Sequence, residues 1–260
     1  MVVITKDGRF GVPPFCDSNF NVIVIDEQAK VAKEMKQGMM LPADLYLLGH
    51  LSEQLPDKPN VLEIGAFFGT STCMIGLHVK EKNGKMTTID PFTGNPTSLL
   101  NLEAIKLTPE QVEALLRENL RRHGLQDTVT IFKGRSDEFD IADNQYDLIF
   151  LDADHRYSYV MSDMERLWPS LREGGLFVGH DFDDPVYNDD FVEVDYALNK
   201  EGTRSVHHGV AKALYEFQIK YKQEVCKFAD DEMIKGSAIW YIKKNDKVVR
   251  PKEVRINDKT

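Results

Sequence analysis

Short apolar runs alternate with longer amphipathic stretches from about Pro42 to Lys243, and this alternation restricts the fold more than any other feature of the sequence. Runs such as YDLIFLD and GGLFVGHD have the length of strands, whereas PEQVEALLRENLRRHG has the length and spacing of an amphipathic helix. Strands that alternate with helices are typical of βαβ units around a parallel sheet. We therefore predict an α/β fold with a doubly wound sheet.

The elements follow from these runs. We expect strands in NVLEIG, MTTID, TVTIFKG, YDLIFLD and GGLFVGHD, and two late strands in VCKFA and SAIWYI. We expect helices in LPADLYLLGHLSEQL, STCMIGLHVKE, PEQVEALLRENLRRHG, YVMSDMERLWPSL and Gly209 to Lys222. Residues Pro91 to Thr108 show no strong period, so they are interpreted as a long connection of the kind that forms lids or binding loops.

The 260 residues suffice for one large domain with a substantial core. We place that domain at residues 38–243, because the periodic pattern is confined to this range. Residues 1–37 are interpreted as an amino-terminal appendage and residues 244–260 as a carboxy-terminal tail. The appendage could serve self-association into a homo-oligomer, although its pattern does not demand it.

Charge and cysteine content exclude several classes of protein. Acidic residues outnumber basic ones by 42 to 32, which argues against nucleic acids and anionic membranes as partners. The three cysteines lie far apart without C-x-x-C spacing, which indicates neither a disulfide framework nor a structural zinc site. Neither an export signal nor a run long enough to cross a bilayer is found, so we expect a cytoplasmic location.

The segment VLEIGAFFGTST places Glu63, Gly65 and Gly69 at the carboxyl end of the first expected strand, where doubly wound sheets bind ligands. A dinucleotide site needs G-x-G-x-x-G, but Phe67 occupies the position of the second glycine and blocks approach of a pyrophosphate. A wider turn with acidic side chains suits S-adenosylmethionine (SAM), which carries a sulfonium and an ammonium but no phosphate. Asp90 ends the second strand, where it could accept hydrogen bonds from a ribose diol or be a plain turn residue.

Two further strand ends carry acidic and histidine side chains. Asp152, Asp154 and His155 follow the fourth strand, and His180 and Asp181 follow the fifth. Parallel order makes these ends neighbours, and converging carboxylates repel unless a cation or proton neutralises them, so we expect a divalent metal. Oxygen ligands favour Mg²⁺, and a histidine moves the preference slightly towards Mn²⁺, Fe²⁺ or Zn²⁺. Alternatively, Asp154 caps the next helix and His180 is only a hydrogen-bonded neighbour of the cofactor.

The segments E-I-G-A-F-F-G-T-S and T-I-D resemble motifs I and II of class I SAM-dependent methyltransferases, particularly the catechol-O-methyltransferase-like and macrocin-O-methyltransferase-like groups. The resemblance runs from about Gly38 to Lys243 and implies a Rossmann-like sheet with strand order 3-2-1-4-5-7-6. It implies that Gly134 to Ser136 lie near the adenine. The cofactor-binding residues that we predict are Glu63, Gly65, Ala66, Phe67, Ser71, Asp90, Arg135, Ser136 and Asp152.

The same resemblance implies metal ligands at Asp152, His180 and Asp181, and catalytic roles for Asp152 and for His155 as the general base. The chain departs from the catechol-type pattern, which has a carboxylate at the position of His180 and a lysine at that of His155. The macrocin-type enzymes are similar in D-A-D-H and G-H-D. An imidazole that titrates near neutrality is suited to accept a hydroxyl proton.

These patterns predict metal-assisted O-methylation of a small hydroxylated acceptor, in which the cation holds the acceptor hydroxyl and lowers its pKa. Two other classes stay open: a nucleotide-cofactor oxidoreductase, and a non-catalytic module that only binds SAM. His207 and His208 either reach over the site or are ordinary residues at a helix start. Acceptor specificity is expected to depend on Met1 to Gly38, Pro91 to Thr108 and Phe182 to His208.

Overall fold

The computed structural model describes residues 42–94, 106–182, 207–227 and 237–245, residues 40 and 102, and the backbone of four two-residue strands. These short strands are β1 (Val3–Ile4), β2 (Phe10–Gly11), β8 (Ala197–Leu198) and β9 (Ser205–Val206). Most of the amino-terminal appendage, the connection after residue 94, the segment before residue 207 and the tail therefore lie outside the described residues. The predictions that concern them stay predictions.

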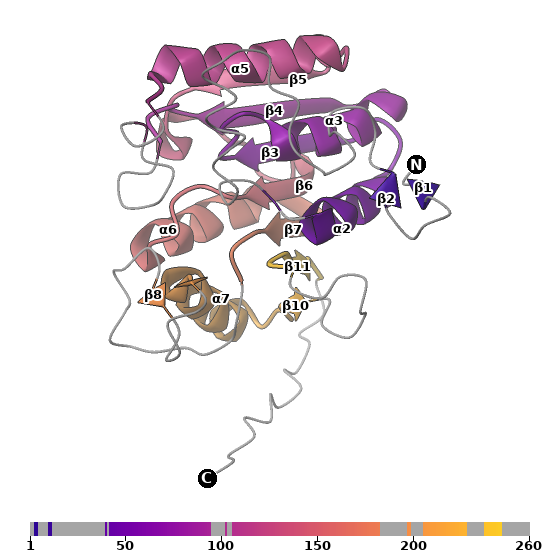
Figure 1. Cartoon of the computed structure of the whole chain (residues 1–260). Helices are drawn as coiled ribbons and strands as arrows, with labels where there is room; N and C mark the ends of the chain where they lie inside the picture. The colour runs from indigo at the N-terminus through magenta and orange to yellow at the C-terminus, as the bar shows by residue number, and fades with distance from the viewer. Residues whose placement is uncertain are drawn as a thin grey trace.

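A seven-stranded sheet forms the centre of the molecule, in the order β10-β11-β7-β6-β3-β4-β5 (Figure 1). Strands β3 to β7 pair in parallel, whereas β11 pairs antiparallel with both β7 and β10. Counted along the expected strands, this order is 3-2-1-4-5-7-6, so the predicted topology is confirmed. The strands are β3 (Asn60–Ile64), β4 (Lys85–Asp90), β5 (Val129–Lys133), β6 (Tyr146–Leu151), β7 (Leu171–Gly179), β10 (Cys226–Lys227) and β11 (Trp240–Lys243).

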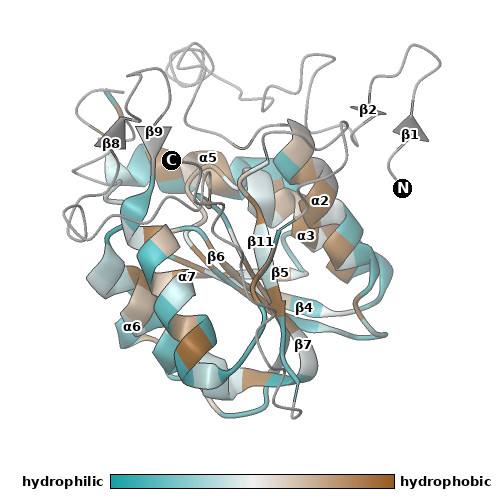
Figure 2. Cartoon of the chain, turned by 90° about the horizontal axis from the view of Figure 1, so that it is seen from below, coloured by the Kyte–Doolittle hydropathy of each residue, from teal (hydrophilic) through white to brown (hydrophobic). Residues whose placement is uncertain are grey.

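Helices cover both faces of the sheet. One buried core contains residues of α2 (Pro42–Glu53), α3 (Thr70–Glu81) and α5 (Pro109–Arg122), and a second contains residues of α6 (Tyr157–Leu167) and α7 (His208–Tyr221). In Figure 2 the apolar strands lie between these two helical layers. Strand β6 serves both cores, because Leu148 and Phe150 face one and Ile149 and Leu151 face the other. Burial on both faces explains why this strand is continuously apolar.

Local signals set the helix ends. Thr108 caps α5 through a reciprocal pair of hydrogen bonds with Gln111, and a proline follows the cap, as is typical of helix starts. The helix expected to run on to residue 171 ends at Leu167, and a single 3-10 turn (Trp168–Ser170) follows, because Pro169 cannot continue an α-helix. No helix among the described residues is long and apolar enough to span a membrane.

Strand β7 begins three residues earlier than the expected start at Gly174. Leu171 pairs with Tyr146, and the register then shifts before Leu176 pairs with Leu148. Gly174 has a φ of +77°, within the irregular part of the strand. Leu171 is fully buried in the second core, so its apolar side chain accounts for the early start.

Candidate functional site

The turn between β3 and α3, residues Gly65 to Gly69, requires glycine at both of its ends. Gly65 and Gly69 have φ values of +91° and +87°, which side chains rarely allow. A Cβ atom on Gly65 would lie 1.9 Å from the backbone oxygen of Asp152. Phe67 also has a positive φ, of 46°. Residues other than glycine rarely adopt this conformation, and those that do are concentrated at functional sites. This glycine turn therefore lies directly against the end of β6.

Asp90 holds the glycine turn in place. Its Oδ2 accepts hydrogen bonds from the N–H groups of Ala66 at 2.9 Å and Phe67 at 2.8 Å, and its Oδ1 accepts from Phe92 at 2.6 Å. Burial raises the pKa of the Asp90 carboxyl, and these amide groups oppose the rise. A carboxylate offers about four acceptor positions, so a ribose diol would bind at the position that these three N–H groups leave. The predicted ribose contact stays a prediction.

Glu63 is fully buried where β3 meets α3. Its two oxygens accept hydrogen bonds from the hydroxyls of Ser71 at 2.5 Å and Thr72 at 2.6 Å. Burial raises the pKa of Glu63 to about 7, although the hydroxyls act in the opposite direction. Glu63 and Ser71 therefore satisfy each other, and the predicted contact of either with a cofactor stays a prediction.

The two residues predicted near the adenine follow β5. Gly134 donates its N–H to the backbone oxygen of Asp90 at 3.2 Å, which places this segment beside the end of β4. Ser136 donates to Asp163 of α6 at 2.5 Å, whereas the exposed Arg135 pairs with Asp137 at 2.9 Å. The predicted cofactor residues thus lie along the carboxyl ends of adjacent strands, as the sequence pattern indicates.

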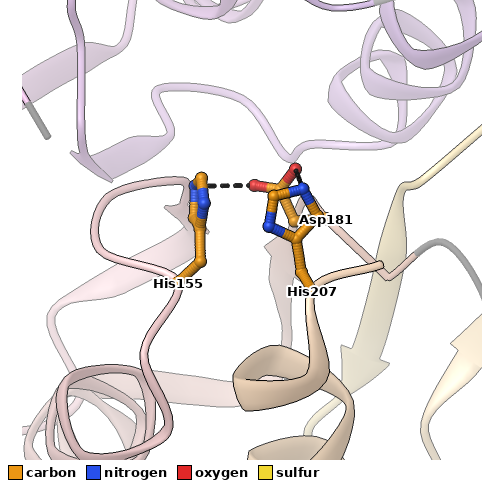
Figure 3. Close-up of side chains that lie close together, drawn as sticks. All are labelled: His155, Asp181 and His207. Carbon is orange, nitrogen blue, oxygen red and sulfur yellow. Dashed lines mark ion pairs between the residues drawn. The ribbon is translucent and has the colours of Figure 1, made fainter. Parts of the chain in front are cut away.

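Asp181 is the centre of a second group of side chains. Its Oδ2 is 2.9 Å from His155 Nε2, and its Oδ1 is 3.2 Å from His180 Nδ1 and 3.3 Å from His207 Nε2. Asp152 Oδ1 is 3.9 Å from His155 Nε2 and 4.0 Å from His180 Nδ1. We call these five residues the Asp181 cluster. Figure 3 shows His155 and His207 reaching Asp181 from different segments of the chain.

Close backbone contact brings His207 into this cluster. A Cβ atom on Gly209 would lie 2.3 Å from the backbone oxygen of His155, so the first turn of α7 rests directly on the loop after β6. The rings of His155 and His207 then meet edge to face, with their centroids 4.5 Å apart. The sequence left the role of His207 open, and the glycine two residues later is the only local signal of this approach.

The histidines and aspartates of the cluster shift one another's protonation. Burial would raise the pKa of Asp181, but the charges of His155 and His180 outweigh it and hold that pKa well below its usual range. Burial would lower the pKa of His180, but Asp181 and Asp44 outweigh it and raise that pKa well above its usual range. His180 is therefore protonated and Asp181 ionised near neutral pH, and a cation at this place would compete with the His180 proton.

Polar and apolar side chains line a small, partly open cavity beside the cluster. Asp152, His155, His180 and Asp181 form its polar side. Asp154 also reaches the cavity, but its carboxylate is engaged by Arg156, whose Nε lies 2.9 Å away and whose N–H donates at 3.0 Å. The N-cap of α6 is Arg156, without a side-chain capping bond, so Asp154 holds the loop before the helix and does not cap the helix itself. The apolar side of the cavity consists of Leu151, Ala153, Val160, Val210 and Trp240.

Two sets of residues in the cluster have the spacing of metal ligands. One atom from each of Asp152, His180 and Asp181 lies within 4.8 Å of the others, and the same holds for His155, Asp181 and His207. The first set is the one predicted from the sequence. Two carboxylates and one imidazole are donors that suit a divalent cation. The residues present therefore fit a metal, and their role as ligands stays a prediction.

Comparison with known families bears on the same region. Residues 62–182 match a family model described as a methyltransferase domain. This segment of the chain is therefore similar to that family of methyltransferase domains. The match begins inside β3 and ends directly after Asp181, so it includes the glycine turn, Asp90 and four of the five residues of the Asp181 cluster. His207 of α7 and the whole of α2 lie outside the matched range.

Solved structures of O-methyltransferases share the fold of this chain. An O-methyltransferase of Bacillus cereus, solved with S-adenosylhomocysteine (SAH), has a TM-score of 0.57 at 17% identity, over 85% of this chain and 93% of that chain. An O-methyltransferase of Streptomyces achromogenes involved in tomaymycin synthesis, solved with SAM, has a TM-score of 0.54 at 13% identity, over 86% and 92%. An uncharacterized protein of Acanthamoeba polyphaga mimivirus is 24% identical over 164 residues, which is 62% of this chain and 69% of that protein. At these identities the solved structures establish the Rossmann-like methyltransferase fold.

Proposed function

We propose that this protein is a SAM-dependent O-methyltransferase that acts on a small hydroxylated acceptor with the help of a divalent cation. The observation that carries the proposal is the contact between Gly65 and Asp152, which joins the glycine turn to the Asp181 cluster within the segment that is similar to methyltransferase domains. A methyl donor and an acceptor hydroxyl must meet within a few ångströms. Adjacent strand ends that carry a cofactor turn and a polar cluster supply such a meeting place.

The glycine turn supports SAM over a dinucleotide. Phe67 stands where a pyrophosphate would need glycine, and its ring lies 3.8 Å, between centroids, from that of Phe68. The fold relatives from Bacillus cereus and Streptomyces achromogenes were solved with SAH and SAM, which agrees with this preference. SAM supplies a methyl group bound to a positively charged sulfur, and the carboxylates at the ends of β4 and β6 favour a cationic ligand.

The Asp181 cluster supports the cation and the general base. Asp152, His180 and Asp181 would hold a divalent cation, which supplies the positive charge that orients an acceptor hydroxyl and lowers its pKa. His155 lines the cavity, and its Nε2 lies 2.9 Å from Asp181 Oδ2. His155 would accept the hydroxyl proton at Nε2, and the charge of Asp181 beside it would stabilise the imidazolium that forms. The apolar side of the cavity, formed in part by Val160 and Trp240, would exclude water from the acceptor.

Binding and turnover test this proposal separately. Calorimetric titration with SAM and SAH should show binding at micromolar concentrations, whereas NAD and NADP should not bind. SAH production should then be measured with phenolic, sugar and natural-product hydroxyl acceptors, before and after removal of metal with a chelator. Asp152→Asn should lose turnover, and Asp127→Asn, an exposed position before β5 at the opposite end of the strand, serves as its control. A folded protein that binds nicotinamide cofactors and neither SAM nor SAH would contradict the proposal.

A further inference from the structure

Asp44 of α2 contacts the ring nitrogen of His180 that does not face Asp181. His180 Nε2 is 3.1 Å from Asp44 Oδ2, while its Nδ1 is 3.2 Å from Asp181 Oδ1. Asp44 is 1% exposed, so this pair is shielded from water. The imidazole of His180 therefore lies between one carboxylate on the helix layer and the carboxylates of the cavity.

The orientation of the Asp44 carboxylate is fixed from a third direction. Its Oδ1 accepts hydrogen bonds from the hydroxyl of Ser237 at 2.6 Å and from the N–H of Ala238 at 2.8 Å, just before β11. Trp240 donates its Nε1–H to the backbone oxygen of His180 at 3.0 Å, which anchors the histidine from the same strand. Asp44 Oδ2 is thereby held towards His180.

The chemistry of the two partners then determines the tautomer of His180. A carboxylate only accepts hydrogen bonds, so the nitrogen that faces Asp44 must carry a proton. Nδ1 faces the carboxylates of Asp181 and Asp152, so without a cation this nitrogen carries a proton as well. A cation held by Asp152 and Asp181 would displace the proton of Nδ1 and leave the proton of Nε2, which faces Asp44. A histidine that ligates a metal commonly donates its second N–H to such a carboxylate.

We propose that Asp44 is a positioning residue that holds His180 as the Nε2–H tautomer, so that Nδ1 can ligate the divalent cation of the proposed site. The inference rests on the proposed metal function and adds to it a residue of α2, outside the matched methyltransferase segment. It also explains why the carboxylate of Asp44 is buried although it does not line the cavity. Partners of this kind are worth about 10-fold to 100-fold in metal affinity.

The decisive variant is Asp44→Asn, assayed in the full chain. The side-chain amide can keep the oxygen that Ser237 and Ala238 use, but it presents an N–H donor to His180 and so favours the opposite tautomer. Binding of Mn²⁺, followed by electron paramagnetic resonance, should weaken about 10-fold to 100-fold, while calorimetric affinity for SAH should change less than about twofold. Ser52→Ala is the matched control, because it removes a buried hydrogen bond of the same helix, from Ser52 to the backbone oxygen of Leu48, and leaves Asp44 and its partners in place. Its Mn²⁺ affinity should stay close to that of the wild type.

A measurement on the unmodified chain keeps the test independent of folding. Nitrogen-15 spectra of the Zn²⁺-loaded protein should show His180 protonated at Nε2 and metal-bound at Nδ1. The opposite tautomer, or an Asp44→Asn variant that binds Mn²⁺ as the wild type does, would overturn the role of Asp44 alone. A wild type that binds SAH but no Mn²⁺ would overturn the metal part of the proposed function as well, so the two failures are distinguishable.

Discussion

Gly65 approaches Asp152 so closely that a Cβ atom on the glycine would lie 1.9 Å from the backbone oxygen of the aspartate. The contact continues the pairing of β3 and β6, since Asp152 donates its N–H to Ile64 at 2.9 Å. Asp152 belongs to the Asp181 cluster, and Gly65 begins the glycine turn. The proposed cofactor and acceptor sites therefore share one edge of the sheet and are coupled through its backbone.

Gly65→Ala should damage both the turn and cofactor binding. The methyl group meets backbone at Asp152, so the turn must move, and the expected cost is about 2 kcal/mol of folding stability together with at least about a tenfold loss of SAH affinity. Urea unfolding and calorimetry measure the two effects. Gly174→Ala is the matched control, because Gly174 also has a positive φ, of +77°, but nothing lies within 4 Å of its Cβ position. Equal losses in both variants would contradict the importance of the contact.

Gly209→Ala should separate α7 from the loop after β6. A Cβ atom there would lie 2.3 Å from the backbone oxygen of His155, so His207 and His155 should move apart. A displacement of about 1 Å can lower a reaction rate roughly 100-fold. We therefore expect the turnover of the variant to fall at least about tenfold. Gly49→Ala provides the comparison, since its Cβ would meet side chains and no backbone. The nearest atoms are the sulfur of Met74 at 3.2 Å and His78 Nε2 at 3.5 Å. Undiminished turnover of Gly209→Ala would count against this role of α7.

Glu63→Gln should change how stability depends on pH. The folded pKa of Glu63, about 7, lies above the ordinary value of 4.5, so the folded state holds the proton more tightly than the unfolded state. The contribution of Glu63 to stability is therefore fully present below about pH 4.5 and is lost as the pH rises towards 7. Relative to Glu63→Gln, the wild type should lose up to about 3 kcal/mol over this window. Urea unfolding at pH 4.5 and pH 8 checks this, and parallel curves for the two proteins would refute it.

His155→Gln should remove the general base and spare the cofactor site. The loss of a positioned base typically lowers turnover by about 100-fold to 10,000-fold, whereas SAH affinity should remain within about twofold. Steady-state rates of SAH formation and calorimetry report the two quantities. His207→Gln, which removes the ring in contact with His155, should lower turnover less. If His207→Gln lowers turnover more than His155→Gln does, the general base has been assigned to the wrong residue.

His180→Asp should alter the choice of metal. An imidazole ligand is accepted more readily by Mn²⁺ than by Mg²⁺, whereas carboxylates suit both ions. In competition between the two ions, the wild type should bind Mn²⁺ more tightly than Mg²⁺, and the ratio of the two affinities should be smaller in the variant. An unchanged ratio of the two affinities would exclude His180 as a ligand.

Sequence patterns predicted the parts of the fold that depend on neighbouring residues. The apolar runs located the strands, and the parallel topology brought Asp152, His180 and Asp181 to one edge of the sheet. Asp44 could not be found in this way. An acidic residue in the first turn of a helix has an ordinary explanation in the helix dipole, and its partners Ser237 and Ala238 lie more than 190 positions further along the chain.

Glu63 shows a second limit of sequence reasoning. Its place at the end of a strand predicts contact with a ligand, which stays a prediction, but the sequence did not predict its hydrogen bonds to the hydroxyls of Ser71 and Thr72 in α3. His207 was left open for a related reason. Its position depends on the close approach of Gly209 to the backbone at His155, which no local periodicity encodes.

The most direct test is a crystal structure of the full chain with SAH and Mn²⁺, located by anomalous scattering. The proposed function predicts SAH along the ends of β3, β4 and β5, with the Mn²⁺ peak between Asp152, His180 and Asp181 beside it. SAH bound away from the glycine turn, or a metal peak that avoids these three side chains, would contradict the account.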